Sequence, residues 1–516
     1  MQRYFNVAGP CTPHKHYLLP TRERCAEIHA LIDSEQFFVI HAARQSGKTT
    51  LLNALQQDLE ASGKYHALYC SLEAVQGLED AREGIPAVFE TICLAMRRVP
   101  GLDPLLFSEG LEAAHFTTVL GDAFGRLCGR LDKPLVMLFD EADCLSGQTL
   151  ITFLRQLRDG YVNRIRAPFI HSLALVGMRS IRDYKAEVRP GGTTLGSASP
   201  FNIVTKSLTL HNFTRDEIGT LYAQHTADTG EAFAPEAVDR AHYWTEGQPW
   251  LVNALAREIV MEMPARDRSV AVSAALIDEA AERLMCRRDT HLDSLLERLK
   301  EPRVRGVIEP VMTGGGGEID RLGDDFEYVK DLGLVKVTLG TIAPANPIYA
   351  TVIARTLNFN TQENLPASLM ERWITPDGVD MDALLREFQQ FWRENSDIWI
   401  GRYEYREAAP HLILMAFLQR VLNGGALIER EMGSGRKRID LGIRFRGRNY
   451  PLEIKLHYGP KTLPEGLAQL SEYMDTLGAR RGWLVIFDRR TEPAWEEKIS
   501  WREETVAGRE IAVVGC

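Results

Sequence analysis

Apolar and polar residues alternate in two neighbouring runs near the carboxyl end of the chain. The runs are Arg438-Ile-Asp-Leu-Gly-Ile-Arg-Phe445 and Tyr450-Pro-Leu-Glu-Ile-Lys-Leu456. Strict alternation predicts two half-buried strands, and the residues between them, 446–449, are typical of a hairpin turn. Folding about this turn is expected to bring Asp440 close to Lys455, with Glu453 one diagonal step away on the same face.

Other apolar runs predict buried strands of a parallel sheet, because both faces of such strands are covered. These runs lie at 37–41, 65–72, 134–140 and 172–178. Helical spacing predicts an amphipathic helix at 381–393, packed between the two halves of the chain, and another at 464–477. Thr214 and Glu217 are spaced as a capping box at the start of a further helical region.

A strand, a tight loop and a helix follow one another at 37–55. This order predicts a phosphate-binding loop, because backbone N–H groups and the helix N-terminus then point at phosphate oxygens. Lys48 is expected to reach the β- and γ-phosphates of ATP, and the Thr49 hydroxyl to ligate Mg²⁺. Ala42 stands where the usual pattern has its first glycine. The remaining expected nucleotide-binding residues of the loop are Ala42, Gln45, Ser46, Gly47 and Thr50.

The apolar run at 134–140 ends in the adjacent acids Asp140 and Glu141. Such a strand is typical of the Walker B motif, in which the first acid holds Mg²⁺ through water and the second activates the hydrolytic water. Asp143 has a simpler explanation as a helix cap or loop acid, so we leave it outside the predicted site.

Together these motifs resemble the additional-strand class of P-loop ATPases, in its AAA-like and STAND-type branches. The resemblance implies that Arg179 lies near the γ-phosphate, although a surface salt bridge explains it equally well. Gly247-Gln-Pro249 resembles the Gly-x-Pro motif of STAND ATPases, which implies that Pro249 packs beside the base; a simple helix-start turn is the alternative. Residues 291–358 resemble a winged helix whose second helix is acidic, which favours a packing module over a DNA reader.

The alternating runs resemble the PD-(D/E)XK nuclease superfamily. This resemblance implies that Asp440 and Glu453 hold Mg²⁺ and that Lys455 positions the attacking water. Gln469 and Tyr473 lie at i and i+4 of the following predicted helix, as in the RecB-like branch, where they contact nucleic acid. Glu407 is a candidate extra metal ligand at the start of a preceding helix, which Pro410 interrupts.

Charge around the first run supports a phosphate-facing surface. Between Arg436 and Arg448 there are six basic residues and one acid, Asp440. A lone acid in a basic strand is typical of a metal ligand beside bound phosphate, with Arg436 and Arg438 as nucleic-acid contacts. An exposed hairpin with ordinary surface charges is the alternative interpretation.

Composition limits the remaining possibilities. The chain has 516 residues and a net charge of −10, which excludes a protein that coats nucleic acid through overall charge. The eight cysteines form no Cys-x-x-Cys pair, which disfavours zinc and favours a cytoplasmic location. No apolar run reaches membrane-spanning length, and we expect neither a signal peptide nor a membrane partner.

The sequence thus predicts an α/β protein with five parts. They are a P-loop AAA-like ATPase core at 1–210, a helical lid at 211–290, a winged helix at 291–358, a helical linker at 359–400 and a restriction-endonuclease-like PD-(D/E)XK domain at 401–516. The predicted function is an ATP-regulated, Mg²⁺-dependent DNA nuclease, with defence against phage or foreign DNA as its setting. The alternative is a STAND-like ATP-driven switch whose C-terminal domain binds nucleic acid without cutting. Homo-oligomerisation is left open.

Overall fold

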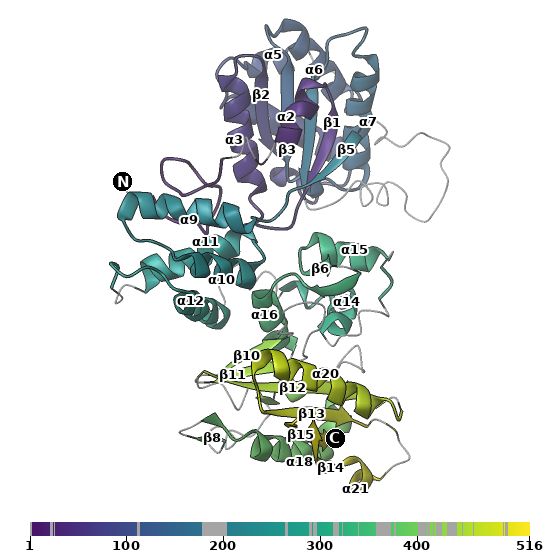
Figure 1. Cartoon of the computed structure of the whole chain (residues 1–516). Coiled ribbons are helices and arrows are strands. Elements are labelled where there is room, and N and C mark those ends of the chain that lie inside the picture. The colour runs from purple at the N-terminus through teal and green to yellow at the C-terminus, as the bar shows by residue number, and fades with distance from the viewer. Residues whose placement is uncertain are drawn as a thin grey trace. The chain divides into compact units, whose positions relative to one another are not determined.

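The computed structural model describes most of the chain (Figure 1). The chain divides into two compact units. One unit is Met1–Leu284 with Lys330–Gly333, and the other is Met285–Val329 with Leu334–Cys516. The described residues are 3–20, 24, 26–110, 114–177, 204–263, 267–287, 292, 297–312, 319–321, 323–338, 340–357, 373–375, 378–400, 410, 413–415, 417–418, 426–430, 441–445, 447–457, 459–488, 490 and 494–516.

The first unit is built on a parallel five-stranded sheet. Its strands are β1 (Phe37–His41), β2 (His66–Ser71), β3 (Leu135–Asp140), β4 (Ser172–Gly177) and β5 (Val204–Thr209). Their order across the sheet is β2-β3-β4-β1-β5, so β4 is inserted between the strands that carry the two nucleotide-binding motifs. This confirms the predicted parallel sheet and its additional strand. The polar edge strand β5 was not predicted, because its sequence has no continuous apolar run.

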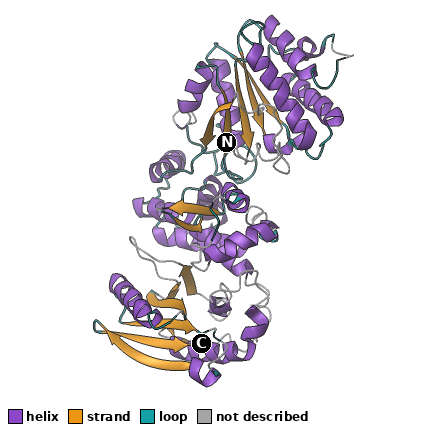
Figure 2. Cartoon of the chain, turned by 90° about the vertical axis from the view of Figure 1, so that its right-hand side faces the viewer, coloured by secondary structure: helices purple, strands orange, loops and turns teal. Residues whose placement is uncertain are grey.

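Helices cover both faces of this sheet, and each face has its own hydrophobic core (Figure 2). Phe37 and Val39 of β1 belong to one core, and Phe38 and Ile40 belong to the other. Burial on both sides explains why the strands read as uninterrupted apolar runs. The covering helices are α2 (Ala26–Asp33) and α3 (Lys48–Ala61) on one face, and α4 (Ala81–Met96), α5 (Pro104–Ser108), α6 (Val119–Arg130) and α7 (Gly147–Asn163) on the other.

A helical region completes the first unit. It contains α9 (Arg215–Thr229), α10 (Pro235–Thr245), α11 (Pro249–Arg257), a π-helical turn (Glu258–Glu262) and α12 (Ala274–Arg287). The Thr214 hydroxyl accepts a hydrogen bond from the Glu217 N–H at 3.2 Å, and the Glu217 carboxylate accepts one from the Thr214 N–H at 2.7 Å. The predicted capping box is therefore confirmed.

The second unit begins with helices followed by a small β-hairpin. The elements are α14 (Pro302–Met312), α15 (Asp324–Asp331), the antiparallel strands β6 (Val335–Thr338) and β7 (Thr341–Pro344), and α16 (Pro347–Leu357). The Arg303 guanidinium lies 3.5 Å from the ring centroid of Tyr328 and pairs with Asp325 at 3.5 Å. One carboxylate of the acidic helix α15, that of Asp325, is thus paired within the unit itself.

A mixed six-stranded sheet forms the C-terminal part, in the order β10-β11-β12-β13-β15-β14. Its strands are β10 (Ala426–Arg430), β11 (Leu441–Phe445), β12 (Arg448–Leu456), β13 (Arg481–Phe487), β14 (Ser500–Val506) and β15 (Arg509–Gly515). Strand β12 pairs antiparallel with β11 and parallel with β13. The short hairpin β8 (Ile374–Thr375) and β9 (Gly378–Val379) precedes the sheet, and the helices are α18 (Met381–Ile400), α20 (Thr462–Leu477) and α21 (Trp495–Lys498).

The predicted register of the β11–β12 hairpin is wrong by two residues. Leu441 pairs with Leu452, and Phe445 pairs with Arg448, so β12 begins inside the segment that was expected to form the turn. Gly447, with φ 77°, adopts the left-handed conformation that allows a two-residue connection. The expected pairing of Asp440 with Lys455 depended on the longer turn, and Asp440 itself lies outside the described residues.

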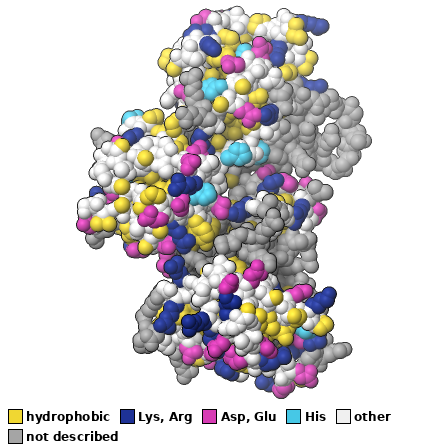
Figure 3. Space-filling view, in the orientation of Figure 1, with side chains coloured by type: hydrophobic (Ala, Val, Ile, Leu, Met, Phe, Trp, Pro, Cys, Tyr) yellow, Lys and Arg dark blue, Asp and Glu magenta, His cyan; other side chains and the backbone are white. Residues whose placement is uncertain are grey.

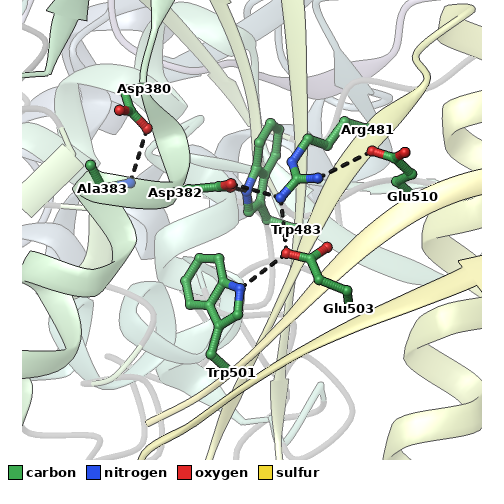
Figure 4. A network of polar contacts seen from close by, with 8 residues as sticks. All are labelled: Asp380, Asp382, Ala383, Arg481, Trp483, Trp501, Glu503 and Glu510. Carbon is green, nitrogen blue, oxygen red and sulfur yellow. Dashed lines mark hydrogen bonds and ion pairs between the residues drawn. The ribbon is translucent and has the colours of Figure 1, made fainter.

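Helix α18 packs on this sheet, which belongs to one of the two halves of the chain between which the helix was expected to lie. The rings of Phe388 and Trp392 lie 6.0 and 4.8 Å from the ring of Phe487. At the start of the helix, Asp382 accepts hydrogen bonds from Arg481 at 2.6 Å and from the Trp483 indole at 2.7 Å (Figure 4). An amphipathic pattern predicts that one face is buried, but it does not identify the surface that buries it.

No helix among the described residues is both long enough and apolar enough to cross a lipid bilayer.

Candidate functional site

The phosphate-binding loop connects β1 to α3. Gln45 and Gly47 have positive φ values of 58° and 89°, which turn the backbone sharply just before the helix begins at Lys48. The free N–H groups of the first turn of α3 therefore follow directly on the loop. This is the geometry in which a helix N-terminus receives an anion.

The Lys48 side chain is held against this loop. Its ammonium group donates hydrogen bonds to the carbonyls of Ala42 at 2.9 Å and Ala43 at 3.0 Å. Burial lowers the pKa of Lys48, while the carboxylates of Glu141 and Asp140 act in the opposite direction. A buried cation that is bonded to neutral carbonyls is stabilised further when a phosphate anion binds beside it. The lysine therefore fits the role predicted for it.

Asp140 stands at the end of β3, beside the first turn of α3. It is 1% exposed, and its Oδ2 accepts hydrogen bonds from the Thr49 hydroxyl at 2.7 Å and the Tyr69 hydroxyl at 3.0 Å. Its Oδ1 accepts one from the Glu141 N–H at 3.0 Å. Burial, and then the charge of Asp140, raises the pKa of Tyr69. No sequence motif singles out Tyr69, and only its position on the strand next to β3 places it here.

Glu141 follows in a left-handed backbone conformation, with φ 52°. Burial raises the pKa of its carboxyl group, and the charge of Asp140 adds to this effect, whereas Lys48 opposes it. An elevated pKa is suited to a general base that must take a proton from water. Glu141 thus has the environment that its predicted role requires.

Asp143 also approaches this site, although the sequence analysis left it out. A Cβ atom added to Gly177 at the end of β4 would lie 2.4 Å from Asp143 Oδ2. The charge of Asp143 also acts on the pKa of Lys48. The third acid of the motif therefore lies between the ends of β3 and β4, and Gly177 is small because the carboxylate occupies the space beside it.

The residues present fit a phosphate ligand. The Ser46 hydroxyl is buried, with the residue 4% exposed, and it has no hydrogen-bond partner among the residues that the structure describes. A buried hydroxyl without a partner is costly unless a ligand satisfies it. Together with the adjacent Thr49–Asp140 pair, whose oxygens are of the kind that Mg²⁺ prefers, this loop fits a nucleotide and its metal ion.

The helical region and the N-terminal segment both contact the loop. The Gln248 amide donates to the Gln45 carbonyl at 3.4 Å and, through its oxygen, caps α11 by accepting from the Leu251 N–H at 2.6 Å. The Cys11 N–H donates to the Thr50 hydroxyl at 2.9 Å. Pro249, the residue predicted to pack beside the base, is the buried first residue of α11. Arg179 lies outside the described residues.

A second polar cluster lies on the C-terminal sheet, on the face that α20 covers. Glu453 is fully buried, with its Oε1 atom 2.7 Å from the Lys455 ammonium group. Lys455 also donates to the Gln469 side-chain oxygen of α20 at 3.0 Å. Tyr473, one helical turn further along, is 4% exposed. The structure thus brings Gln469 of α20 to Glu453 and Lys455, which the sequence had placed together on one face of a strand.

The structure does not describe four of the residues that were predicted for this second site. Asp440, Glu407, Arg436 and Arg438 all lie outside the described residues. Within the described part of the chain, no group of three or more His, Cys, Asp or Glu residues is arranged to hold a metal ion. Glu453 is the described member of the metal-binding set predicted for this second site, and its burial beside a cation fits such a role.

Basic residues are present on the same domain but do not dominate its surface. Arg444 and Arg448 are exposed on the β11–β12 hairpin. On the face shown in Figure 3, basic and acidic side chains of this domain are interspersed. Contacts with nucleic acid would accordingly depend on local groups of charges, as the net charge of the chain also indicates.

Comparison with known proteins identifies the first two thirds of the chain. The model of the AAA-like domain family matches residues 20–353. The chain belongs to this family. Its class is accordingly that of the P-loop ATPases, as the sheet order and the phosphate-binding loop also indicate. The match ends before the six-stranded sheet begins, and no curated protein matches the chain.

Solved structures with related folds are distant. The Walker-type ATPase PABY2304 of Pyrococcus abyssi is 14% identical, with a TM-score of 0.48, over 68% of this chain and 99% of that one. The Thermotoga maritima RuvB Holliday junction branch migration motor is 13% identical, with a TM-score of 0.34, over 63% and 90%. Cdc6p from Pyrobaculum aerophilum is 14% identical, with a TM-score of 0.37, over 67% and 95%. These values describe a distant likeness.

Proposed function

We propose that this AAA-like ATPase is an ATP-regulated, Mg²⁺-dependent DNA nuclease whose cutting site lies on the C-terminal sheet. The observation that carries the proposal is the buried Glu453 beside Lys455, with Gln469 of α20 bonded to the same lysine. A structural ion pair rarely needs full burial, because desolvation offsets much of its attraction. A buried acid next to a positioned ammonium group is, in contrast, typical of a functional site.

ATP hydrolysis would take place at the loop between β1 and α3. Lys48 exchanges the carbonyls of Ala42 and Ala43 for phosphate oxygens, and the Ser46 hydroxyl gains a partner at the same time. Glu141 takes a proton from the attacking water, for which its raised pKa suits it. Thr49 and Asp140 would hold Mg²⁺, the threonine directly and the aspartate through water.

Phosphodiester cleavage would take place at the second cluster. Asp440 and Glu453 would hold Mg²⁺ there, while Lys455 orients the attacking water and Gln469 fixes the position of the lysine. At both sites the ion supplies positive charge beside phosphate oxygens, which favours the charge of the transition state. Tyr473, Arg436 and Arg438 would contact the nucleic acid.

Regulation would follow from contacts around the nucleotide. Gln248 joins the helical lid to the phosphate-binding loop, so the lid is in a position to respond when a nucleotide binds. This response would control the cutting site, in a homo-oligomer if a second subunit completes the ATPase site. Defence against phage or foreign DNA is the setting that we infer for this activity from the family resemblance.

A cleavage assay with matched variants tests the proposal. Plasmid DNA is incubated with the purified full chain and Mg²⁺, with and without ATP, and with the variants Asp440→Asn, Glu453→Gln and Lys48→Ala. We expect cutting by the wild type, none by the first two variants, and cutting that no longer responds to ATP in the third. Glu465→Gln removes an exposed carboxylate of the same domain and is expected to cut normally.

The same variants separate the proposal from the signalling alternative when their ATP-dependent assembly is measured alongside cutting. A wild-type protein that does not cut, yet assembles in an ATP-dependent way that Lys48→Ala abolishes, would identify a nucleotide-driven switch. Cutting that survives both Asp440→Asn and Glu453→Gln would show that the residues of the second cluster are not catalytic.

A further inference from the structure

Tyr69 lies on β2, two residues before the end of that strand. In the parallel register Tyr69 pairs with Leu138, and Ser71 pairs with Asp140. Along the strand direction, Tyr69 therefore lies two residues before the level of Asp140 on the neighbouring strand. Its ring packs with the core between the sheet and α3, which includes Leu51 of the first helical turns. The ring is therefore supported by packing, and its hydroxyl projects past the core to Asp140 Oδ2 at 3.0 Å.

The oxygen that Tyr69 contacts is also the one bonded to Thr49. Asp140 Oδ2 accepts from both hydroxyls, while Oδ1 accepts from the Glu141 N–H. A carboxylate that is 1% exposed and held by donors on both oxygens has little freedom to rotate. The donors from β2 and α3 together fix the plane of the group that would bind the metal ion through water.

From this arrangement we propose that Tyr69 is a positioning residue of the ATPase site, which orients Asp140 for the Mg²⁺ that accompanies ATP. The inference rests on the ATPase function of the loop and extends it to a residue outside both nucleotide-binding motifs. Tyr69 does not touch the nucleotide in this role. It acts through the aspartate, as outer-shell partners of metal ligands commonly do.

Tyr69→Phe keeps the packed ring and removes the hydroxyl alone, so it isolates the contact with Asp140. Losing one hydrogen bond to a charged group is expected to raise the Mg²⁺ concentration for half-maximal ATP hydrolysis by about tenfold. The KM for ATP at saturating Mg²⁺ should stay within about twofold of the wild type, because the phosphate contacts of the loop are untouched. Raising Mg²⁺ should restore most of the rate.

A binding measurement that does not depend on turnover accompanies the assay. Calorimetry with ADP alone should give the same affinity for the wild type and Tyr69→Phe. With Mg²⁺ present, the increase in ADP affinity should be smaller in the variant. Tyr65→Phe is the matched control, because it removes a tyrosine hydroxyl that bonds the carboxylate of Asp33 at 2.7 Å, at the far end of the same strand region. This control should match the wild type in every measurement.

The outcomes separate this inference from the ATPase function on which it rests. If the wild type and Tyr65→Phe hydrolyse ATP and Tyr69→Phe has an unchanged Mg²⁺ dependence, Tyr69 does not position Asp140. A rate loss in Tyr69→Phe that added Mg²⁺ does not restore would also overturn the inference. If the wild type and Tyr65→Phe bind and hydrolyse no ATP, the assignment of the site itself is wrong.

Discussion

Replacing Lys455 by methionine removes the positive charge beside the buried Glu453. The ammonium nitrogen and the carboxylate oxygen are 2.7 Å apart, and at an effective dielectric constant of about 20 their attraction is about 6 kcal/mol before desolvation. Desolvation of both groups offsets most of this attraction, and the lysine side chain is still 27% exposed. We therefore expect a net coupling of about 2 kcal/mol between the two side chains.

A double-mutant cycle on the full chain measures this coupling. The variants are Lys455→Met, Glu453→Gln and the double variant, and hydrogen exchange of the amides in β12 and α20 reports the free energy of local opening. A loss of about 2 kcal/mol corresponds to exchange about 30-fold faster in Lys455→Met. The double variant should recover most of that protection, because glutamine leaves no unpaired charge in the core.

Additivity would refute this reasoning. If the two single changes add to within about 0.5 kcal/mol in the double variant, the residues do not interact as a buried ion pair. Lys461→Met, which removes an exposed lysine of the same domain, is the control and should leave the exchange of β12 unchanged. If Lys455→Met exchanges at the same rate as this control, Lys455 is not the counter-charge of Glu453 on which the proposed cutting site depends.

Four further predictions concern the ATPase site. Lys48→Ala should abolish the increase in thermal stability that ATP produces, measured by scanning fluorimetry, because the phosphates lose their buried cation. Glu141→Gln should bind ATP normally but hydrolyse it at least about 100-fold more slowly in a phosphate-release assay. Burial raises the pKa of the Glu141 carboxyl group, so the folded protein holds the carboxyl proton more tightly than the unfolded chain does. Protonation of Glu141 therefore stabilises the folded protein. This stabilisation is complete below the ordinary pKa of glutamate and is lost as the pH rises through the raised pKa. Glu141→Gln should therefore melt at a higher temperature than the wild type at neutral pH, and the difference should shrink on acidification. Gly177→Ala should lower hydrolysis more than ATP binding in the same assays, because a Cβ at that position would lie 2.4 Å from Asp143 Oδ2 and displace it.

The sequence determined the elements whose signal is local. Uninterrupted apolar runs identified four of the strands in the parallel sheet, because burial on both faces removes the polar positions. The phosphate-binding loop and the adjacent acids Asp140 and Glu141 could be recognised from the sequence, because their chemistry requires particular residue types at a fixed spacing. Alternation likewise identified β11 and β12 and placed Glu453 and Lys455 on one face.

Tertiary structure decided which of these elements meet. The hairpin register depended on a turn two residues shorter than its sequence suggested, and Gly447 made that turn possible. The amphipathic helix α18 was identifiable, but only the packing of Phe388 and Trp392 on Phe487 showed which sheet buries it. Tyr69 reaches Asp140 across 71 residues of sequence. Contacts of this kind arise where two strands that are far apart in the sequence lie side by side in the sheet. The local pattern of residues does not indicate which strands become neighbours.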